Sequence, residues 1–513
     1  MRAVPDLGGL RVGIIDNSKP NFNVLAEEMS KVLTERYAVR SVEVFRKPAA
    51  SSPASESVLH DLTVGSDLVI SGSGDCGSCT SYSIRDGVES RKRGVPTVVI
   101  CSDAFIRLGE AQAAAFGCED LAIAVIPHPL GTRTREELAD IAEHCVQDIA
   151  KLIAGGTSAT AGVADPAQQS DLLPVPADQE GFDRFCRERR WSDGLPLIPP
   201  TRERVERMLA GTSLPGDHVV ALVAPGYGAA TVERIAANAV MAGCAAQHLP
   251  VLITAVEAAA DPAFNLQGLQ ATTNPTAPGI LVTGPIAREL GVNGGVNCLG
   301  QGAWANAVIG RAFRLVLQTV GKAFPGEMDR ATQGQPAKYT LCLTESPHAN
   351  PWPPMHVERG LPADQDAVTV FNIAGTLNMN THTKNAEEML RVFADTLIHP
   401  TSNDYWCGGE PWVILAPEHA AVLAQAGLDR LQVKHRLWEL SKMPVSAFSE
   451  RDRARTRRTR AGELGEIPDD ASVPITPSKD GIGLLVAGGP GTHSVYAPGF
   501  GNSRSITRPL AGC

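Results

Sequence analysis

Aromatic and charged residues are scarce in this 513-residue chain, at 5% and 20% of the total. A coiled coil or a disordered chain would carry more charge, so the composition argues against both classes. Lys and Arg form no run longer than Arg91-Lys92-Arg93, and the net charge is −10. Nucleic-acid surfaces need clustered positive charge, so no nucleic-acid partner is expected.

Long apolar runs are also missing. No stretch approaches the roughly 20 apolar residues of a membrane span, and Met1–Asp6 does not resemble the start of a signal peptide. Eleven scattered cysteines, an odd number, do not resemble a secreted disulfide framework. We therefore expect a cytoplasmic protein with no membrane partner, acting in a reducing compartment.

What the chain does have is 43% hydrophobic residues, 49 glycines and 37 prolines, a composition typical of a loop-rich α/β enzyme. Its length exceeds what one hydrophobic core usually serves. Composition shifts predict a first domain over residues 1–155, a linker over 156–180, a larger substrate-pocket domain over 181–468 and a C-terminal segment over 469–513.

Short apolar runs alternate with amphipathic stretches in the first domain, which predicts a parallel sheet covered on both faces. The fold expected is α/β, flavodoxin-like or Rossmann-like. No flavin or nicotinamide cofactor is expected, because the first strand ends in Asp16–Lys19 rather than in a Gly-rich turn. The predicted strands are Leu10–Ile15, Ser41–Phe45, Asp67–Ser71, Pro96–Cys101 and Leu121–Ile126, and the clearest helices are Phe22–Tyr37 and Thr134–Ile153.

The larger domain mixes helical and extended patterns and is predicted to be α/β or α+β. A strand over Ile482–Ala487, followed by a Gly-rich turn over Gly488–Ser494, could join either sheet. The expected helices are Phe182–Arg189, Ala229–Gln247 and Ala303–Phe324, and the expected strands are Val219–Val223, Gly279–Val282, Ala367–Asn372 and Trp412–Leu415.

The most informative stretch is Asp75-Cys76-Gly77-Ser78-Cys79-Thr80, a CxxC pair between the third strand and a predicted helix. The unpaired N–H groups and the macrodipole at a helix N-terminus stabilise a thiolate, which is the reactive form of cysteine. Asp75 or Thr80 is expected to cap this helix. Two buried structural cysteines, or half of a zinc site, are the alternatives.

The pair allows two kinds of chemistry. Cys76 could attack a substrate and Cys79 resolve the adduct, leaving a disulfide that an external thiol or a reductant protein must reduce. This is reductive cleavage by an oxidoreductase. Alternatively, Cys76 alone could form an intermediate that water or another nucleophile discharges, as in a lyase, hydrolase or transferase. A non-catalytic metal- or ligand-binding protein is the third hypothesis.

These residues also carry a family resemblance. Gly74–Thr80, with the following Gly94–Val99, resembles the UGSC family, in which the tetrad begins with selenocysteine or cysteine and here falls on Cys76–Cys79. The chain is more distantly similar to the selenoprotein B subunits of glycine, sarcosine and betaine reductases. Gly488–Ser494, and Gln270–Pro275 in the middle domain, look like parts of longer family members. The resemblance implies a thiol-dependent oxidoreductase acting on a small molecule.

Further candidates follow from position in the predicted sheets. His128, which ends the fifth strand, and His493, in the Gly-rich turn, are expected to transfer protons. Asn380 and His382 alternate with Asn378 and Lys384 along an extended segment and should share one face. Other uncharged polar runs, residues 265–274 and 293–306, are expected to line a pocket or to form turns. The substrate-binding residues predicted in all are Asn17, Ser78, Thr80, Asn274, Asn297, Asn380 and His382.

A zinc site is a further alternative to a thiol enzyme, although no zinc-finger or HExxH spacing supports it. Its candidate ligands are His348, His356 and Glu358 near Cys342, and His399, Asp404 and Cys407. The cysteines expected in the core are Cys101, Cys118, Cys145, Cys186, Cys244 and Cys298, whereas Cys513 is a terminal thiol. The expected partners are a small-molecule substrate, a thiol reductant and a second copy of the chain.

Overall fold

The computed structural model describes residues 7–154, 172–399 and 403–510. Its N-terminal domain is a five-stranded, fully parallel sheet with the order β2-β1-β3-β4-β5. This is the flavodoxin-like strand order, so the predicted α/β class is confirmed. The strands are β1 (Arg11–Asp16), β2 (Ser41–Arg46), β3 (Leu68–Gly74), β4 (Thr97–Ser102) and β5 (Ala122–Ile126).

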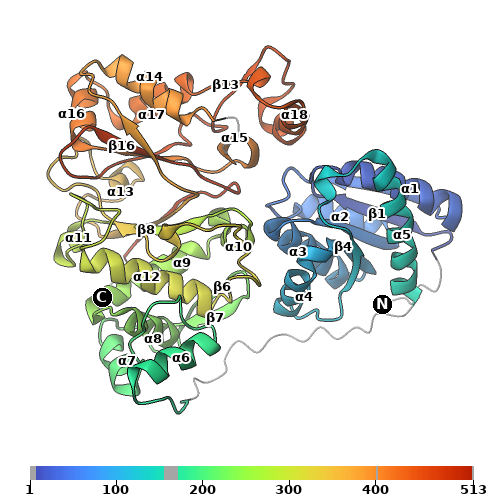
Figure 1. Ribbon diagram of the computed structural model, residues 1–513, viewed down its shortest axis with the longest axis horizontal. Coiled ribbons are helices and arrows are strands. Elements are labelled where there is room, and N and C mark those ends of the chain that lie inside the picture. The colour runs from blue at the N-terminus through green and yellow to red at the C-terminus, as the bar shows by residue number, and fades with distance from the viewer. Residues whose placement is uncertain (1–6, 155–171, 400–402, 511–513) are drawn as a thin grey trace.

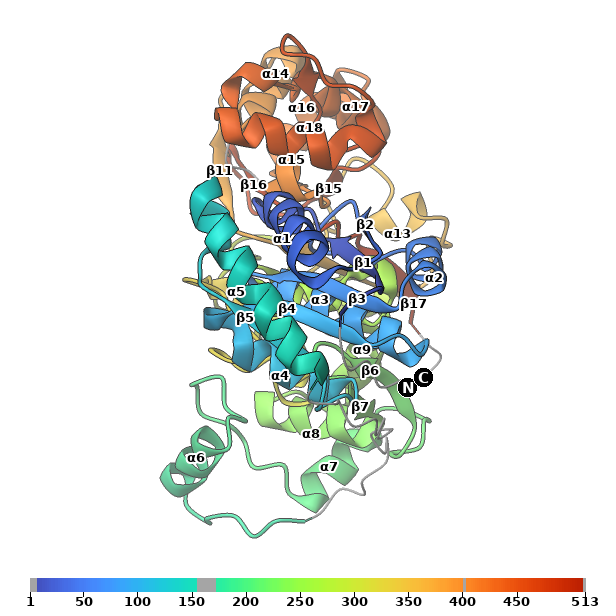
Figure 2. The same ribbon diagram turned by 90° about the vertical axis from the view of Figure 1, so that its right-hand side faces the viewer.

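Helices cover both faces of this sheet (Figures 1 and 2). On one face, α1 (Phe22–Tyr37) and α5 (Arg135–Ala154) share a core with the central strands. The buried residues of α1 include Phe22, Leu25 and Met29, whose spacing places them on one side of a helix. The other face carries α2 (Glu56–Gly65), α3 (Gly77–Lys92) and α4 (Ile106–Ala115).

The rest of the described chain has two main hydrophobic cores. The larger lies between a mixed sheet, β17-β10-β8-β9, and the helices α8 (Val232–Ala242), α9 (Leu249–Ala259) and α12 (Trp304–Thr319). The strands are β8 (Ala277–Thr283), β9 (Cys342–Leu343), β10 (Ala367–Ile373) and β17 (Ile506–Pro509). Around them lie α6 (Gln179–Glu188), α7 (Arg202–Leu209), α10 (Leu266–Ala271) and α11 (Pro285–Glu289).

One helix prediction in this part is wrong at its ends. Residues 229–247 do not form a single helix, because β7 (Gly228–Thr231) pairs with β6 (Val219–Val223). The Thr231 hydroxyl then caps α8 by accepting a bond from the N–H of Arg234 at 3.2 Å. Gly243 ends the helix in a left-handed conformation, at φ 91°. An Ala-rich composition alone does not reveal these two boundaries.

The second core packs a sheet of order β11-β16-β12-β15 against α14 (Ala386–Leu397) and α17 (Arg430–Leu440). The strand predicted over Ile482–Ala487 is β15 (Gly483–Val486), and it pairs in parallel with β12 (Trp412–Leu415). A smaller cluster that includes Phe371 and Trp412 joins this sheet to the first. The remaining elements are β11 (Leu377–Asn380), β13 (Met443–Pro444), β14 (Ser472–Val473), β16 (His493–Ala497), α13 (Met355–Glu358), α15 (Asn403–Cys407), α16 (Pro417–Gln425) and α18 (Glu450–Leu464).

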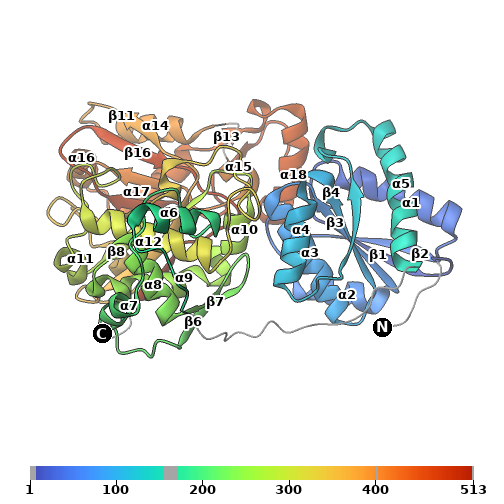
Figure 3. The same cartoon turned by 60° about the horizontal axis from the view of Figure 1, so that its bottom comes forward.

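The N-terminal domain contacts the rest of the chain where its helix α3 packs against α10. Helix α18 also lies at this junction (Figure 3). Asn265 stands at the junction. Its Nδ2 donates to Ser51 O at 2.9 Å and to Gly501 O, and its Oδ1 accepts a bond from the Tyr82 hydroxyl. Gln112 Nε2 adds a bond to Pro225 O at 2.8 Å. Most of the predicted linker, residues 156–171, lies outside the described residues.

Among the described residues, no single helix is long and apolar enough to cross a membrane. One bent pair, Ala246–Ala259 with Pro262–Ala271, passes the test of length and composition together, with an angle of 76° between its halves. Within the protein, α9 packs almost entirely into the larger core.

Candidate active site

The CxxC pair lies where the sequence predicts it, at the N-terminus of a helix that follows β3. Cys76 is the N-cap residue of α3, and Cys79 lies in its first turn. The two residues form a disulfide, with their Cα atoms 5.3 Å apart. Cys76 is partly exposed, whereas only 3% of Cys79 is accessible. Cys76 is therefore the more accessible of the two bonded cysteines.

Buried polar side chains hold this loop in place. Asn17 Nδ2 donates to Ser73 O at 2.9 Å and to Ser83 Oγ at 3.2 Å. Thr80 Oγ1 donates to Cys76 O at 2.7 Å. Asn17 and Thr80 are both completely buried. Both are predicted to bind substrate; in the structure they are buried and hydrogen-bonded to the strand and loop that carry the cysteines.

Asp75 does not cap α3, and neither does Thr80, so that expectation is wrong. The Asp75 carboxylate oxygen Oδ1 lies 2.8 Å from His128 Nδ1 and accepts a bond from the N–H of Leu130 at 3.1 Å. No side chain caps α3 at Cys76. The unpaired N–H groups and the positive end of the α3 dipole therefore act on the sulfurs and on any group bound beside them.

His128 lies on the same edge of the sheet as the cysteines and is tied to the residue that precedes Cys76. Besides Asp75, its Nδ1 faces Ser102 Oγ at 3.3 Å, and Phe105 packs edge-on at a ring distance of 5.5 Å. About 36% of its side chain is exposed. It is not among the described residues that line the pocket beside Cys76.

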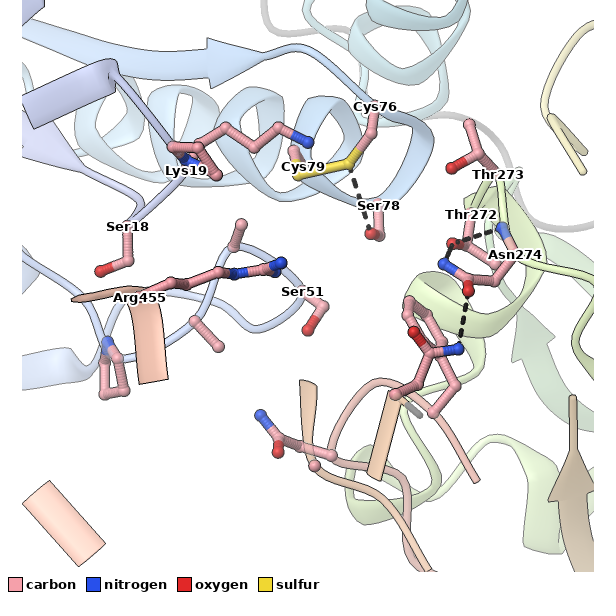
Figure 4. A pocket seen from close by; sticks show the side chains of 18 of the residues that line it. Ser18, Lys19, Ser51, Cys76, Ser78, Cys79, Thr272, Thr273, Asn274 and Arg455 are labelled. Carbon is pink, nitrogen blue, oxygen red and sulfur yellow. Dashed lines mark hydrogen bonds between the residues drawn. A yellow bond between two sulfur atoms is a disulfide. The ribbon is translucent and has the colours of Figure 1, made fainter. Parts of the chain in front are cut away.

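That pocket has a volume of about 270 Å³ and lies between the N-terminal domain and the rest of the chain (Figure 4). It opens beyond the carboxyl ends of β1 and β3, where the strand order reverses and where ligands bind in sheets of this kind. Its described lining residues are Ser18, Lys19, Pro20, Pro48, Ala49, Ala50, Ser51, Cys76, Ser78, Cys79, Thr272, Thr273, Asn274, Asn403, Gly408, Arg455, Arg460, Phe500 and Asn502.

The loops after β1 and β2 complete the wall that carries the cysteines. Asp16 Oδ1 accepts a bond from the N–H of Ser18 at 2.8 Å, and Ser18 Oγ donates to Lys47 O at 2.7 Å. The buried Lys47 ammonium pairs with Asp86 at 2.5 Å, and Asp86 also accepts a bond from Ala54 N at 2.9 Å. A closed network of buried bonds therefore fixes both loops.

The facing wall comes from four separate segments. Thr272, Thr273 and Asn274 belong to the uncharged polar run that was predicted to line a pocket, and Asn274 Oδ1 accepts a bond from Asn403 Nδ2 at 2.7 Å. The other members of that run are buried between domains or in the core. Gln267 Nε2 donates to Ser81 O at 3.3 Å, and Gln270 Oε1 accepts a bond from Arg314 at 2.9 Å.

Four other predicted site residues do not line this pocket. His493 and Asn380 lie on the paired strands β16 and β11, where His493 Nδ1 faces Asn378 Nδ2 at 3.2 Å. His382 follows β11 and faces Thr492 Oγ1 at 3.2 Å. Asn297 bonds to Gln301 O, at 2.7 Å, in the loop before α12. The alternate residues from 378 to 384 are exposed, as expected for one face of an extended segment. They lie along and just after β11, an edge strand of the sheet β11-β16-β12-β15.

The site residues predicted from the sequence include none of the pocket's cations, which are Lys19, Arg455 and Arg460. The two arginines project from α18, which carries six arginines within residues 451–460. This density of arginines in the sequence could have indicated a cluster of positive charge. Acidic and small residues interrupt it, so a search for uninterrupted basic runs passes over it.

The remaining described cysteines are unlike Cys76. Burial raises the pKa of Cys101, Cys145 and Cys244 to about 12, so these thiols stay protonated. No three His, Cys, Asp or Glu side chains in the described part of the chain are placed to hold a metal ion. Cys513 and the side chain of Cys407 lie outside the described residues.

Comparison with curated proteins and with solved structures gives no match. The UGSC family model matches residues 1–155, the region that contains β1 to β5 and the Cys76–Cys79 pair. The N-terminal domain of this chain is therefore a UGSC family domain.

Proposed function

We propose that the protein is a thiol-dependent oxidoreductase that reductively cleaves a bond in a small molecule. The observation that carries the proposal is the unequal exposure of two bonded cysteines beside a pocket. Both cysteines line the pocket, but Cys76 is partly exposed, whereas Cys79 is only 3% exposed and lies at bonding distance from it. A nucleophile and a resolving thiol need this arrangement.

The reaction requires both cysteines in the reduced state. The Cys76 thiolate attacks the substrate R–X, an S–R bond forms, and X leaves with the electron pair. The Cys79 thiolate then attacks the Cys76 sulfur, the S–S bond forms, and R leaves with the electron pair of the broken S–R bond. The two thiol protons end on X and R, so the products are H–X, R–H and the disulfide. A dithiol, small or carried by a protein, returns the pair to the reduced state.

His128 does not line the pocket, so its proposed role is that of a positioning residue. Its Nδ1 lies 2.8 Å from the carboxylate of Asp75, and this bond fixes the residue that precedes Cys76. The uncapped N-terminus of α3 assists by stabilising the thiolate. A redox-neutral lyase or transferase would use the same nucleophile but would not require Cys79, so the role of Cys79 separates the two functions.

Alkylation mapped by mass spectrometry tests the proposal. The reduced protein is treated with limiting iodoacetamide at several pH values, beside Cys76→Ser and Cys79→Ser variants. We expect Cys76 to be modified well below pH 8.5, the region where an ordinary thiol ionises. We also expect that removing dithiol restores the disulfide in the wild type only. Modification of Cys76 no faster than that of the buried cysteines would overturn the proposal.

A further inference from the structure

The pocket beside Cys76 carries a charge opposite to that of the chain. Lys19, Arg455 and Arg460 line it, and no Asp or Glu is among the lining residues that the structure describes. The whole chain has a net charge of −10. At that average the lining residues would be close to neutral, so three cations without a carboxylate call for a separate explanation.

The cations reach the pocket from both of its walls. Lys19 follows β1 on the wall that carries the cysteines, and Arg455 extends from α18 on the facing side (Figure 4). In that view, the ends of both side chains lie on the side of the pocket where Cys79 and Ser18 are found. Both residues also have interactions with other parts of the protein. Arg460 is more deeply buried and donates to Tyr405 O at 3.0 Å.

Positive charges are crowded around this part of α18. Burial lowers the pKa of Arg458, and the charges of Arg46 and Arg455 lower it further, while Asp16 acts in the opposite direction. Arg46 is paired with the Asp16 carboxylate at 2.8 Å and does not line the pocket, whereas Arg455 does.

The volume of the pocket and its neutral lining residues favour a small ligand. Its volume of about 270 Å³ falls below the roughly 300–1,000 Å³ of sites for drug-sized ligands. Thr273, Asn274 and Asn502 supply neutral hydrogen-bonding groups opposite the cysteines. A dinucleotide or a peptide would not fit, whereas a small metabolite with one or two anionic groups would.

We propose that the pocket binds a small molecule through an oxyanion, a carboxylate or a phosphate group, held between Lys19 and Arg455. Charge-assisted bonds of this kind fix both the position and the direction of a ligand. The susceptible bond of the ligand then lies toward Cys76. This last placement rests on the proposed function, whereas the anion site itself rests on the charges and dimensions of the pocket.

The ratio of alkylation rates by iodoacetate and iodoacetamide at Cys76 tests the proposal, because the two reagents share a leaving group and differ in charge. The ratio is normalised to that of N-acetylcysteine. We expect wild type to favour iodoacetate by about tenfold, the value of one charge-assisted bond. Lys19→Gln and Arg455→Gln should lose that preference. Arg457→Gln, on the same helix but bound to Ile467 O at 2.9 Å and outside the pocket, should keep it.

Thermal unfolding in malonate or in inorganic phosphate gives a second readout that does not need a reactive thiol. We expect at least one of these anions to raise the Tm of wild type and of Arg457→Gln, and to raise that of Lys19→Gln and Arg455→Gln much less. The anion that acts distinguishes a carboxylate site from a phosphate site. A normalised ratio near one, with no Tm shift that depends on Lys19 or Arg455, would overturn the anion site. A Cys76 inert to both reagents would instead overturn the proposed function, and the Tm shifts would still decide the anion site.

Discussion

The two walls of the pocket are built in different ways. The wall with the cysteines belongs to one domain, and the network of Asn17, Asp16 and the Lys47–Asp86 pair fixes it internally. The facing wall gathers segments from near residues 272, 403, 455 and 500. The cysteines thus sit on a local scaffold within one domain, while the side chains that face them across the pocket come from distant parts of the chain. This division predicts that chemistry and recognition can be disturbed separately.

The largest effect is expected where the two walls meet. A Cβ added at Gly77 would lie 1.4 Å from the carbonyl oxygen of Ala271, which is backbone and cannot move aside cheaply. Gly77→Ala should therefore separate the N-terminal domain from α10 and abolish the iodoacetate preference of Cys76. Gly65→Ala is the matched control, since its Cβ would meet nothing closer than 4.0 Å. Small-angle scattering would show the change, and an unaltered profile for Gly77→Ala would contradict the docked arrangement.

The internal scaffold should be the next most sensitive. Asp86→Ala leaves the fully buried Lys47 ammonium without its ion-pair partner, which costs about 3–5 kcal/mol of unfolding free energy. Glu89→Ala breaks a 3.0 Å pair with Lys92 on α3 whose side chains are 36% and 48% exposed, and should cost less than about 1 kcal/mol. Urea unfolding measures both. Equal losses would mean that burial of the pair does not govern its contribution.

The buried thiols provide a pH-dependent contrast with the accessible pair. Burial raises the pKa of Cys145 from 9.0 to about 12. Its contribution to stability is therefore complete below pH 9 and is lost as the pH rises toward 12, because the unfolded chain releases the proton first. Cys145→Ala should make the alkaline loss of stability shallower by about 1.4 kcal/mol per pH unit. Urea midpoints from pH 8 to 11 test this, and a slope identical to that of the wild type would contradict it.

The smallest effect is expected from one hydrogen bond across the domain contact. Tyr82→Phe removes the hydroxyl that donates to Asn265 Oδ1, at a cost of about 1 kcal/mol. Tyr37→Phe, at the end of α1 on the opposite side of the sheet, is the control. Thermal unfolding measures both variants, and the idea fails if Tyr37→Phe lowers Tm as much as Tyr82→Phe does.

The sequence predicts the first domain well because its signals are local. Each predicted strand overlaps an observed one, and the position of Cys76 at a helix N-terminus follows from a strand, two glycines and a helix in succession. Asp75 shows the limit of such reasoning. Its position just before a predicted helix suggested a helix cap. The segment after β5 instead brings His128 and the Leu130 N–H within reach, and the carboxylate bonds to them.

The facing wall of the pocket could not be predicted in the same way. Nothing in the local sequence of Arg455 or Asn403 indicates that they share a cavity with Cys76, because long-range packing brings them together. His493 shows the converse case, a local pattern that lies elsewhere in the fold. Its Gly-rich turn has the pattern of a ligand loop, yet β16 pairs with β11 and β12 in the second sheet, away from the pocket beside Cys76. A local motif therefore identifies a reactive group more readily than the surroundings of that group.

The most direct test of the central claim is a redox titration of the folded protein. It would be equilibrated with mixtures of reduced and oxidised dithiothreitol, quenched with acid and mapped by mass spectrometry. We predict a single reversible two-electron transition that converts Cys76 and Cys79 between dithiol and disulfide, while Cys101 and Cys145 remain thiols throughout. A pair that stays in one state across the whole range, or that changes only after unfolding, would contradict a redox role for Cys76 and Cys79.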